Sequence, residues 1–131
     1  DNTRGLLADA LAPKVKRVPE YASLADLANS DAAVFINCPP LGMAGGPDPN
    51  ASPLPPEAFR ARGNPPALPV VFDTVYNPVE TPLLRQAKAA GCPTIDGVQM
   101  FVRQACVQSL AWTGRLPEEG LFDRLVRGSP A

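Results

Sequence analysis

Two short, continuously apolar runs constrain the fold of this chain more than any other feature of its sequence. They occupy residues 32–37 (AAVFIN) and 67–73 (ALPVVFD). Strands that are buried on both faces have this continuous apolar character, and it is typical of parallel sheets. Parallel neighbours need a long crossover connection rather than a tight hairpin. The two runs therefore predict a parallel sheet with helices between its strands.

Helix signals alternate with these runs. Thr81-Pro82 is typical of a helix start, and Gly91 of the end of the helix LLRQAKAA that follows it. Ser23 can cap a short helix that ends near Asn29. The other expected elements are helices at 4–12, 98–113 and 117–126, a helix start at 55–59, and short strands at 15–18 and 93–95. This alternation predicts a doubly wound α/β sheet, with the last helix docked on the body.

Residues 38–56 are expected to form a loop. They contain Pro-Pro, Gly-Gly and Pro-Asp-Pro-Asn, which favour turns and show no hydrophobic period. The glycine cluster at 42–46 follows a predicted strand, but it lacks the GxGxxG spacing of a dinucleotide-binding turn. We interpret the cluster as part of the loop rather than as a phosphate cradle.

Composition excludes several classes of function. Twelve basic and thirteen acidic residues give a net charge of −1, so neither nucleic acid nor an anionic membrane is predicted as a partner. No apolar run is long enough to cross a bilayer. Three cysteines without a CxxC pair predict neither a disulfide framework nor a zinc site, and a reducing compartment is expected. Without histidine, no metal site is predicted, and acid–base chemistry needs another residue type or another part of the protein.

Four segments resemble successive signatures of the shikimate dehydrogenase family in order and spacing. They are residues 37–43 (NCPPLGM), 71–78 (VFDTVYNP), 81–84 (TPLL) and 96–105 (DGVQMFVRQA). The chain is most similar to the plant and algal enzymes, in which this domain usually follows a 3-dehydroquinate dehydratase. The resemblance implies that residues 1–131 are a partial NADP-binding domain: the carboxy-terminal half of a Rossmann-like doubly wound parallel sheet, plus closing helices at 98–126 that pack toward the substrate cleft.

The resemblance also implies roles for particular residues. Tyr76 and Gln104 would contact shikimate or 3-dehydroshikimate, and a glutamine amide offers the donors and acceptors that a polyol requires. Thr74 and Gly97 would lie beside the nicotinamide, where glycine permits close approach of the backbone. The remaining cofactor-binding residues implied in this way are Asn37, Gly42, Met100, Asn2, Thr3 and Arg4, of which the last three would hold the adenosine 2′-phosphate.

Each of these residues also has a structural interpretation. From the residues alone, Gln104 is a solvated helix position and Tyr76 a packed aromatic ring with a wet hydroxyl. Asp73 and Asp96 are interpreted as turn-formers or caps. Cys92 is expected at a strand edge, Cys106 in the core, and the apolar stripe of the last helix, Leu121, Phe122 and Leu125, in core packing.

The chain also departs from the family pattern. Pro39 replaces a hydroxyl residue, so weaker cofactor binding is expected, and the family's catalytic lysine, aspartate and glycine-rich loop have no counterpart here. The expected function is therefore a part of an NADP-dependent shikimate dehydrogenase, inactive alone, whose sheet is completed by the rest of the enzyme or by a partner chain. Alternatives are a non-catalytic remnant with a structural role and a quinate dehydrogenase. The expected location is plastid or cytoplasm.

Overall fold

The computed structural model describes residues 23–63, 66–118 and 120–127. The helix expected at 4–12, the strand expected at 15–18, and Asn2, Thr3 and Arg4 lie outside these ranges. The described elements are α2 (Leu24–Ala28), β1 (Val34–Asn37), the 3-10 helix η1 (Pro56–Phe59), β2 (Val70–Asp73), α3 (Pro82–Ala89), β3 (Thr94–Ile95), α4 (Gly97–Thr113) and α5 (Leu121–Arg127).

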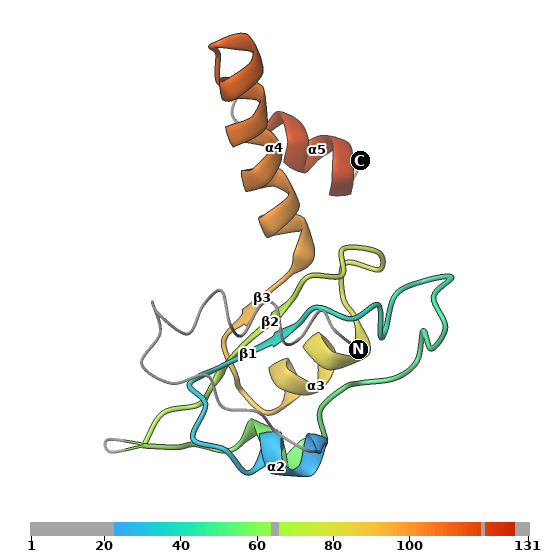
Figure 1. Cartoon of the computed structure of the whole chain (residues 1–131), viewed down its shortest axis with the longest axis vertical. Coiled ribbons are helices and arrows are strands. Elements are labelled where there is room, and N and C mark those ends of the chain that lie inside the picture. Colours follow the sequence, from blue (N-terminus) through green and yellow to red (C-terminus); the bar gives the residue numbers. More distant parts are fainter. Residues whose placement is uncertain (1–22, 64–65, 119, 128–131) are drawn as a thin grey trace, which may run out of the picture.

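The three strands form one parallel sheet in the order β1-β2-β3 (Figure 1). Val34 pairs with Val70 and Asn37 with Asp73, so β1 and β2 end at the same level of the sheet. β3 is shorter and aligns Ile95 with Phe72. The two apolar runs are thus adjacent parallel strands, and the expected α/β class is confirmed.

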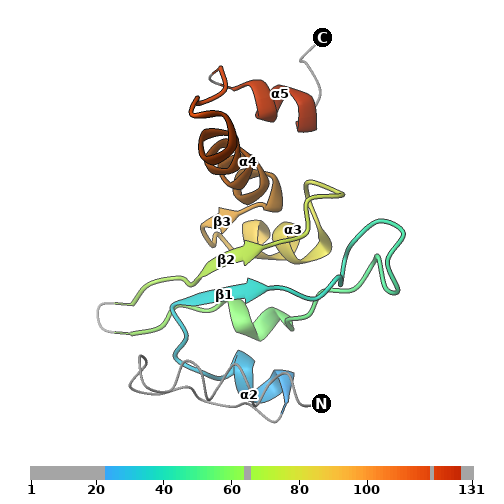
Figure 2. The same cartoon turned by 45° about the horizontal axis from the view of Figure 1, so that its top comes forward.

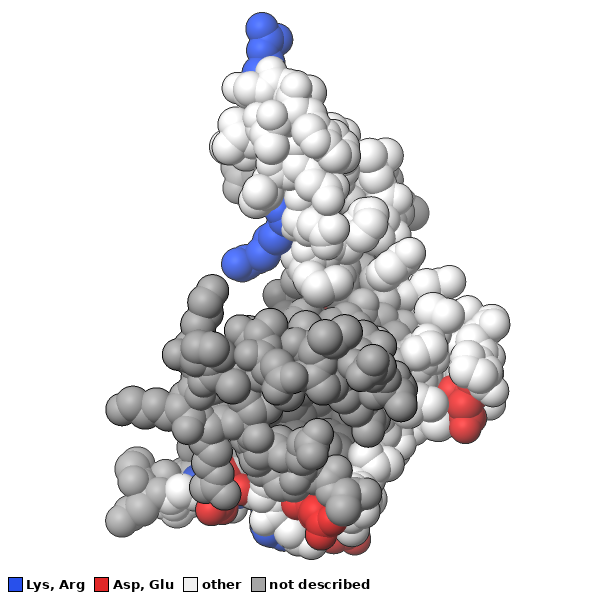
Figure 3. Space-filling model, viewed as in Figure 1, with Lys and Arg blue, Asp and Glu red and all other residues white. Residues whose placement is uncertain are grey.

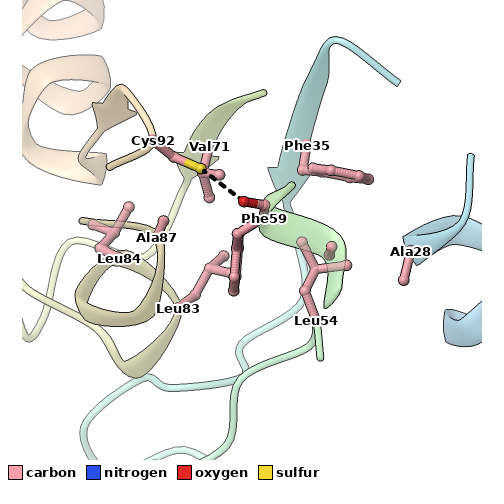
Figure 4. Packing of buried hydrophobic residues seen from close by; sticks show 10 residues of the cluster. Ala28, Phe35, Leu54, Phe59, Val71, Leu83, Leu84, Ala87 and Cys92 are labelled. Atoms are coloured by element: carbon pink, nitrogen blue, oxygen red, sulfur yellow. Dashed lines mark hydrogen bonds between the residues drawn. The ribbon is translucent and has the colours of Figure 1, made fainter. Parts of the chain in front are cut away.

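One face of this sheet carries the core. Phe35 and Val71 point to that face and pack with α3, η1 and the end of α2 (Figure 4). The other members of the cluster are Ala28, Leu54, Ala58, Phe59, Leu83, Leu84, Ala87 and Cys92. On the opposite face, Val34, Ile36 and Ile95 are exposed within the described part of the chain. The sheet therefore buries one apolar face and leaves the other open.

The helix starts and stops follow from local sequence chemistry. The hydroxyl oxygen of Thr81 accepts a hydrogen bond from the Leu84 amide at 3.3 Å, and Pro82 follows it as the first helical residue. Ser23 caps α2 and Asp96 caps α4 in the same way. Gly91, with φ at 80°, and Gly114, with φ at 71°, follow the ends of α3 and α4. These cap predictions are confirmed.

The carboxy-terminal helices differ from expectation. α4 extends away from the sheet layer and α5 lies against α4, as Figures 1 and 2 both show. The expectation that α5 docks on the body with Leu125 in core packing was wrong, because Leu125 is 70% exposed. Trp112 is 80% exposed for the same reason: this end of α4 has no other layer of the described chain beside it.

Candidate functional site

The carboxyl ends of β1 and β2 lie side by side, and ligands of open α/β sheets bind at this edge. Asn37 ends β1, Asp73 ends β2, and the two residues are register partners. Thr74 then ties the two strand ends together, since its amide and its hydroxyl both donate to the carbonyl oxygen of Asn37, at 3.0 and 2.9 Å. Two of the residues named by the resemblance, Asn37 and Thr74, are thus in direct contact.

Asp73 is fully buried and binds three donors. Its Oδ1 accepts from Asn37 Nδ2 at 2.9 Å and from the Val75 amide at 3.0 Å. Its Oδ2 accepts from Thr81 Oγ1 at 2.6 Å. The carboxylate therefore connects both strand ends to the start of α3, as the turn-forming interpretation of Asp73 predicts.

A cavity of about 260 Å³ opens at this edge. Thr74 and Tyr76 form one wall, and the loop after β1 forms the other; the complete lining is Cys38, Pro40, Met43, Ala44, Thr74, Val75, Tyr76 and Asn77. The two walls are joined by a hydrogen bond of 2.8 Å from the Ala44 amide to the Asn77 carbonyl. The lining is neutral and combines hydroxyl, amide and backbone groups with apolar surface, which suits a neutral polar ring rather than a free phosphate.

Gly42 supports this loop from beneath. It is buried with φ at 79°, and a Cβ at this position would lie 3.1 Å from Pro82 Cδ and 3.3 Å from the Ala51 carbonyl oxygen. The glycine thus lets the loop turn closely over the start of α3. Gly42 does not line the cavity itself but shapes the loop that forms one of its walls.

Gly97 places α4 beside the same site. A Cβ on this residue would lie closer than 3.0 Å to the backbone of Thr74 and Val75. The family resemblance explains this glycine by close approach of a cofactor, and the structure gives a further reason in the contact between two segments of this chain. That crossing could not be found from sequence, because it depends on the tertiary path of the backbone.

The two predicted substrate residues line different cavities. Gln104 and Met100 face a larger space of about 580 Å³ between α4 and the open face of the sheet. Its lining is Phe72, Ile95, Gln99, Met100, Arg103, Gln104, Val107 and Gln108. Tyr76 is 50% exposed, and its ring lies 5.4 Å from that of Phe101. The helix α4 therefore lines the larger cavity through Gln104 and contacts Tyr76, in the wall of the smaller cavity, through Phe101.

Sequence reasoning gave no functional role to Phe101, Arg103 or Gln108. The spacing of Gln104 and Gln108 by four residues places both on one helix face, and that signal was available in the sequence. The ring contact between Phe101 and Tyr76 was not available, because these residues belong to separate elements.

The two cysteines nearest the sheet differ in burial. Burial raises the pKa of Cys92, which lies in the core and away from the cavities described above. Cys38 is exposed and lines the smaller cavity. Within the described ranges, no group of three or more histidine, cysteine or acidic residues could hold a metal. No helix in that same part of the chain has the length and apolar character to span a bilayer.

One buried polar side-chain atom has no hydrogen-bond partner among the described residues. The amide nitrogen of Asn37 donates to Asp73, so the Oδ1 atom of Asn37 faces away from the carboxylate and has no hydrogen-bond partner among the described residues. Asn37 is only 5% exposed, and a buried oxygen of this kind normally accepts a hydrogen bond. Asn37 does not line the smaller cavity, so this oxygen lies beside that cavity rather than in its wall.

The parallel sheet, with a cavity at the carboxyl ends of adjacent strands, defines a Rossmann-like α/β protein. No protein-family model matches the chain. A shikimate dehydrogenase (NADP(+)) of Pelobacter propionicus is 47% identical over 89 residues, which is 67% of this chain and 30% of that protein. Sequence and structure together support membership in the shikimate dehydrogenase family.

Solved structures agree with this result. A shikimate dehydrogenase in complex with NADP+ matches 93% of this chain and 41% of its own, with a TM-score of 0.73 and 30% identity. The quinate dehydrogenase of Corynebacterium glutamicum in complex with NAD matches 97% of this chain and 42% of its own, with a TM-score of 0.69 and 28% identity. The chain thus spans about a third of the length of the relatives that it matches.

Proposed function

We propose that this chain is part of an NADP-dependent shikimate dehydrogenase, which reduces 3-dehydroshikimate to shikimate. The observation that carries the proposal is the junction of Thr74, Val75 and Gly97 beside the neutral cavity at the ends of β1 and β2. A relative named for this activity is 47% identical over 67% of this chain, and a solved structure with the same name matches 93% of it in fold. We assign the nicotinamide end of the cofactor to this cavity.

The residues of this chain would bind and orient the reactants. NADPH supplies the hydride when it is bound. Thr74 and the backbone at Gly97 would face the nicotinamide. Met100 lines the larger cavity, and its role as a further cofactor contact is implied by the family resemblance alone. Asn37 and Gly42 shape the turn next to the ribose and diphosphate. Asn2, Thr3 and Arg4 would hold the 2′-phosphate.

Tyr76 and Gln104 would bind the substrate. Tyr76 is half-exposed and Gln104 is exposed, and the hydroxyl of one and the amide of the other offer neutral donors and acceptors for ring hydroxyls. In this chain the two side chains line different cavities, Tyr76 the smaller and Gln104 the larger. Proton transfer would come from a lysine and an aspartate elsewhere in the complete protein.

The rest of that protein would cover the open surfaces of this chain. Val34 and Ile36 are exposed on the open sheet face, and most of the surface of α4 seen in Figure 3 is uncharged. On α4 the large apolar side chains Val107, Leu110 and Trp112 are exposed, and exposed apolar side chains gathered in this way are typical of an interface. A finer part of the proposal is that the protein is of the plant type, with a fused dehydratase domain and a plastid location. The gene sequence upstream of Asp1 tests whether it encodes a dehydratase domain and a plastid-targeting segment.

Quinate dehydrogenase is the second candidate, because a quinate dehydrogenase matches nearly the whole chain in fold. The test is oxidation of shikimate and of quinate by the full-length protein with NADP+ and with NAD+. The proposal expects the highest kcat/KM for shikimate with NADP+. A preference for quinate would select the second candidate, and no activity with either would favour a non-catalytic remnant.

Two variants connect that assay to the site. Tyr76→Phe and Gln104→Ala each remove hydrogen-bonding groups, and each should lower kcat/KM for shikimate by roughly tenfold to a hundredfold. Gln86→Ala is the matched control, since Gln86 is an exposed glutamine on α3. If all three variants had equal kcat/KM, Tyr76 and Gln104 would not be substrate-binding residues.

A further inference from the structure

The segment Thr74 to Tyr76 forms one wall of the smaller cavity, and the buried carboxylate of Asp73 fixes its first residues. Asp73 Oδ1 holds the Val75 amide at 3.0 Å. The same oxygen holds Asn37 Nδ2 at 2.9 Å, across the gap between the two strands. The path of the chain after β2 is therefore tied to the end of β1 by one atom.

The second oxygen of Asp73 ties the same turn to α3. Thr81 Oγ1 donates to Asp73 Oδ2 at 2.6 Å and also accepts from the Leu84 amide. Asp73 and Thr81 are both fully buried. Because the Thr81 hydroxyl has one hydrogen, donation to Asp73 and acceptance from Leu84 are compatible, and the helix start becomes part of the same network.

The network requires a side chain that only accepts hydrogen bonds. An ionised aspartate presents two acceptor oxygens, whereas an asparagine presents one oxygen and one NH2 group. An amide at position 73 would turn its NH2 group either toward Thr81 or toward the donors at Asn37 and Val75. The aspartate also sets the Asn37 amide so that its nitrogen faces Asp73 and its Oδ1, which has no donor among the described residues, faces away.

We propose that Asp73 is a positioning residue of the cofactor site: it holds Thr74 and Tyr76 in the binding geometry and fixes the orientation of the Asn37 amide at the end of β1. This inference rests on the proposed function, which assigns the nicotinamide end to that cavity. Asp73 does not touch cofactor or substrate, because it is fully buried beneath the turn. It acts through Val75, Asn37 and Thr81.

The test uses the full-length protein and two measurements that do not require turnover. The first is the dissociation constant for NADPH from a fluorescence titration, and the second is hydrogen exchange of the Val75 amide without ligand. In Asp73→Asn we expect NADPH to bind about tenfold more weakly and the Val75 amide to exchange faster, since a neutral oxygen is the weaker acceptor. Glu80→Gln is the matched control: Glu80 lies in the same turn, is exposed and binds Lys88. It should bind NADPH as the wild type does.

A second pair of variants covers the case in which Asp73→Asn does not fold. Thr81→Val removes the donor to Asp73 and should weaken NADPH binding several-fold, and Thr81→Ser restores the hydroxyl and should restore the affinity. Wild-type affinity in folded Asp73→Asn, or equal affinity in the two Thr81 variants, would overturn the inference while leaving the proposed function intact. If the wild-type protein itself fails to bind NADPH, the proposed function fails and the inference fails with it.

Discussion

Arg62 shows at the residue scale how one side chain can hold separate backbone segments together. Its guanidinium donates to the carbonyl oxygens of Ala28 and Ser30 at 2.7 Å, and to those of Ala58 and Arg60 at 2.6 and 2.8 Å. It also lies 5.3 Å from the centre of the Phe35 ring. The guanidinium spreads five N–H donors over three nitrogens in a planar fork, whereas the lysine ammonium has three donors on one nitrogen, too few for these four carbonyl groups.

Arg62→Lys should therefore lower the free energy of unfolding by about 2 kcal/mol, because several buried or half-buried carbonyl groups lose a charged donor. Equilibrium unfolding of the full-length protein in urea measures the change. Arg60→Lys is the control, since Arg60 is exposed and its guanidinium binds the neighbouring Asn29. A loss no larger in Arg62→Lys than in Arg60→Lys would contradict this account of the α2 and η1 junction.

Cys92 gives a prediction of pH dependence at the same scale. Burial raises the pKa of its thiol in the folded protein, whereas the unfolded thiol ionises near its ordinary pKa of about 8.5. Above that pH the unfolded state holds fewer protons than the folded state, so the free energy of unfolding falls as pH rises. The stability advantage of wild type over Cys92→Ala should therefore shrink between about pH 7 and pH 10 in denaturation experiments. A constant difference would show that the thiol ionises equally in both states.

At the scale of elements, the site depends on where α4 begins. Gly97 lets the first turn of this helix touch the backbone of Thr74 and Val75, and Asp96 caps the helix one residue earlier. A helix start that moved outward would separate Phe101 from Tyr76, whose rings are in contact. The geometry of the edge is thus set by helix placement as much as by the loop residues.

Gly97→Ala should move α4 away from this turn, lower the free energy of unfolding by about 1 to 3 kcal/mol and weaken NADPH binding. Gly45→Ala is the matched control, because Gly45 has φ at 75° but no described atom within 4 Å of the place that a methyl group would take. It should cost about 1 kcal/mol through backbone strain alone, with unchanged affinity for NADPH. Unchanged affinity in Gly97→Ala as well would show that α4 placement does not control the cavity.

Sequence predicted the elements well where their signals are local. The strands at 34–37 and 70–73 lie within the two apolar runs, and the caps at Thr81, Asp96 and Gly91 come from residue chemistry within one turn. Contacts between elements could not be predicted in this way. The collision that excludes a side chain at Gly97, the separation of Tyr76 from Gln104, and the docking of α5 on α4 all depend on how distant segments cross.

At the scale of the whole molecule, the chain has one covered and one open sheet face. Trp112, the single tryptophan of the chain, stands near the end of α4 and is 80% exposed. If the rest of a longer protein covers α4, this side chain is buried there. The exposed apolar surface of this chain thus fits its similarity to about a third of each relative.

The fluorescence of Trp112 reports whether the rest of the full-length protein covers this end of α4. In the isolated chain its fluorescence should resemble that of tryptophan in water and be quenched readily by iodide. In the full-length protein, the difference spectrum between wild type and Trp112→Phe should be shifted to the blue and resist quenching, as expected of a buried indole. A water-like difference spectrum in the full-length protein would show that this end of α4 stays uncovered.

The most direct test of the central claim is hydrogen exchange of the full-length protein, measured by mass spectrometry with and without NADP+. The claim is that the carboxyl ends of β1 and β2 form the cofactor site. We expect NADP+ to slow exchange in peptides that cover residues 37–44 and 74–77, and to leave peptides from η1 unchanged. Binding of NADP+ without protection of either segment would place the cofactor elsewhere and contradict the account.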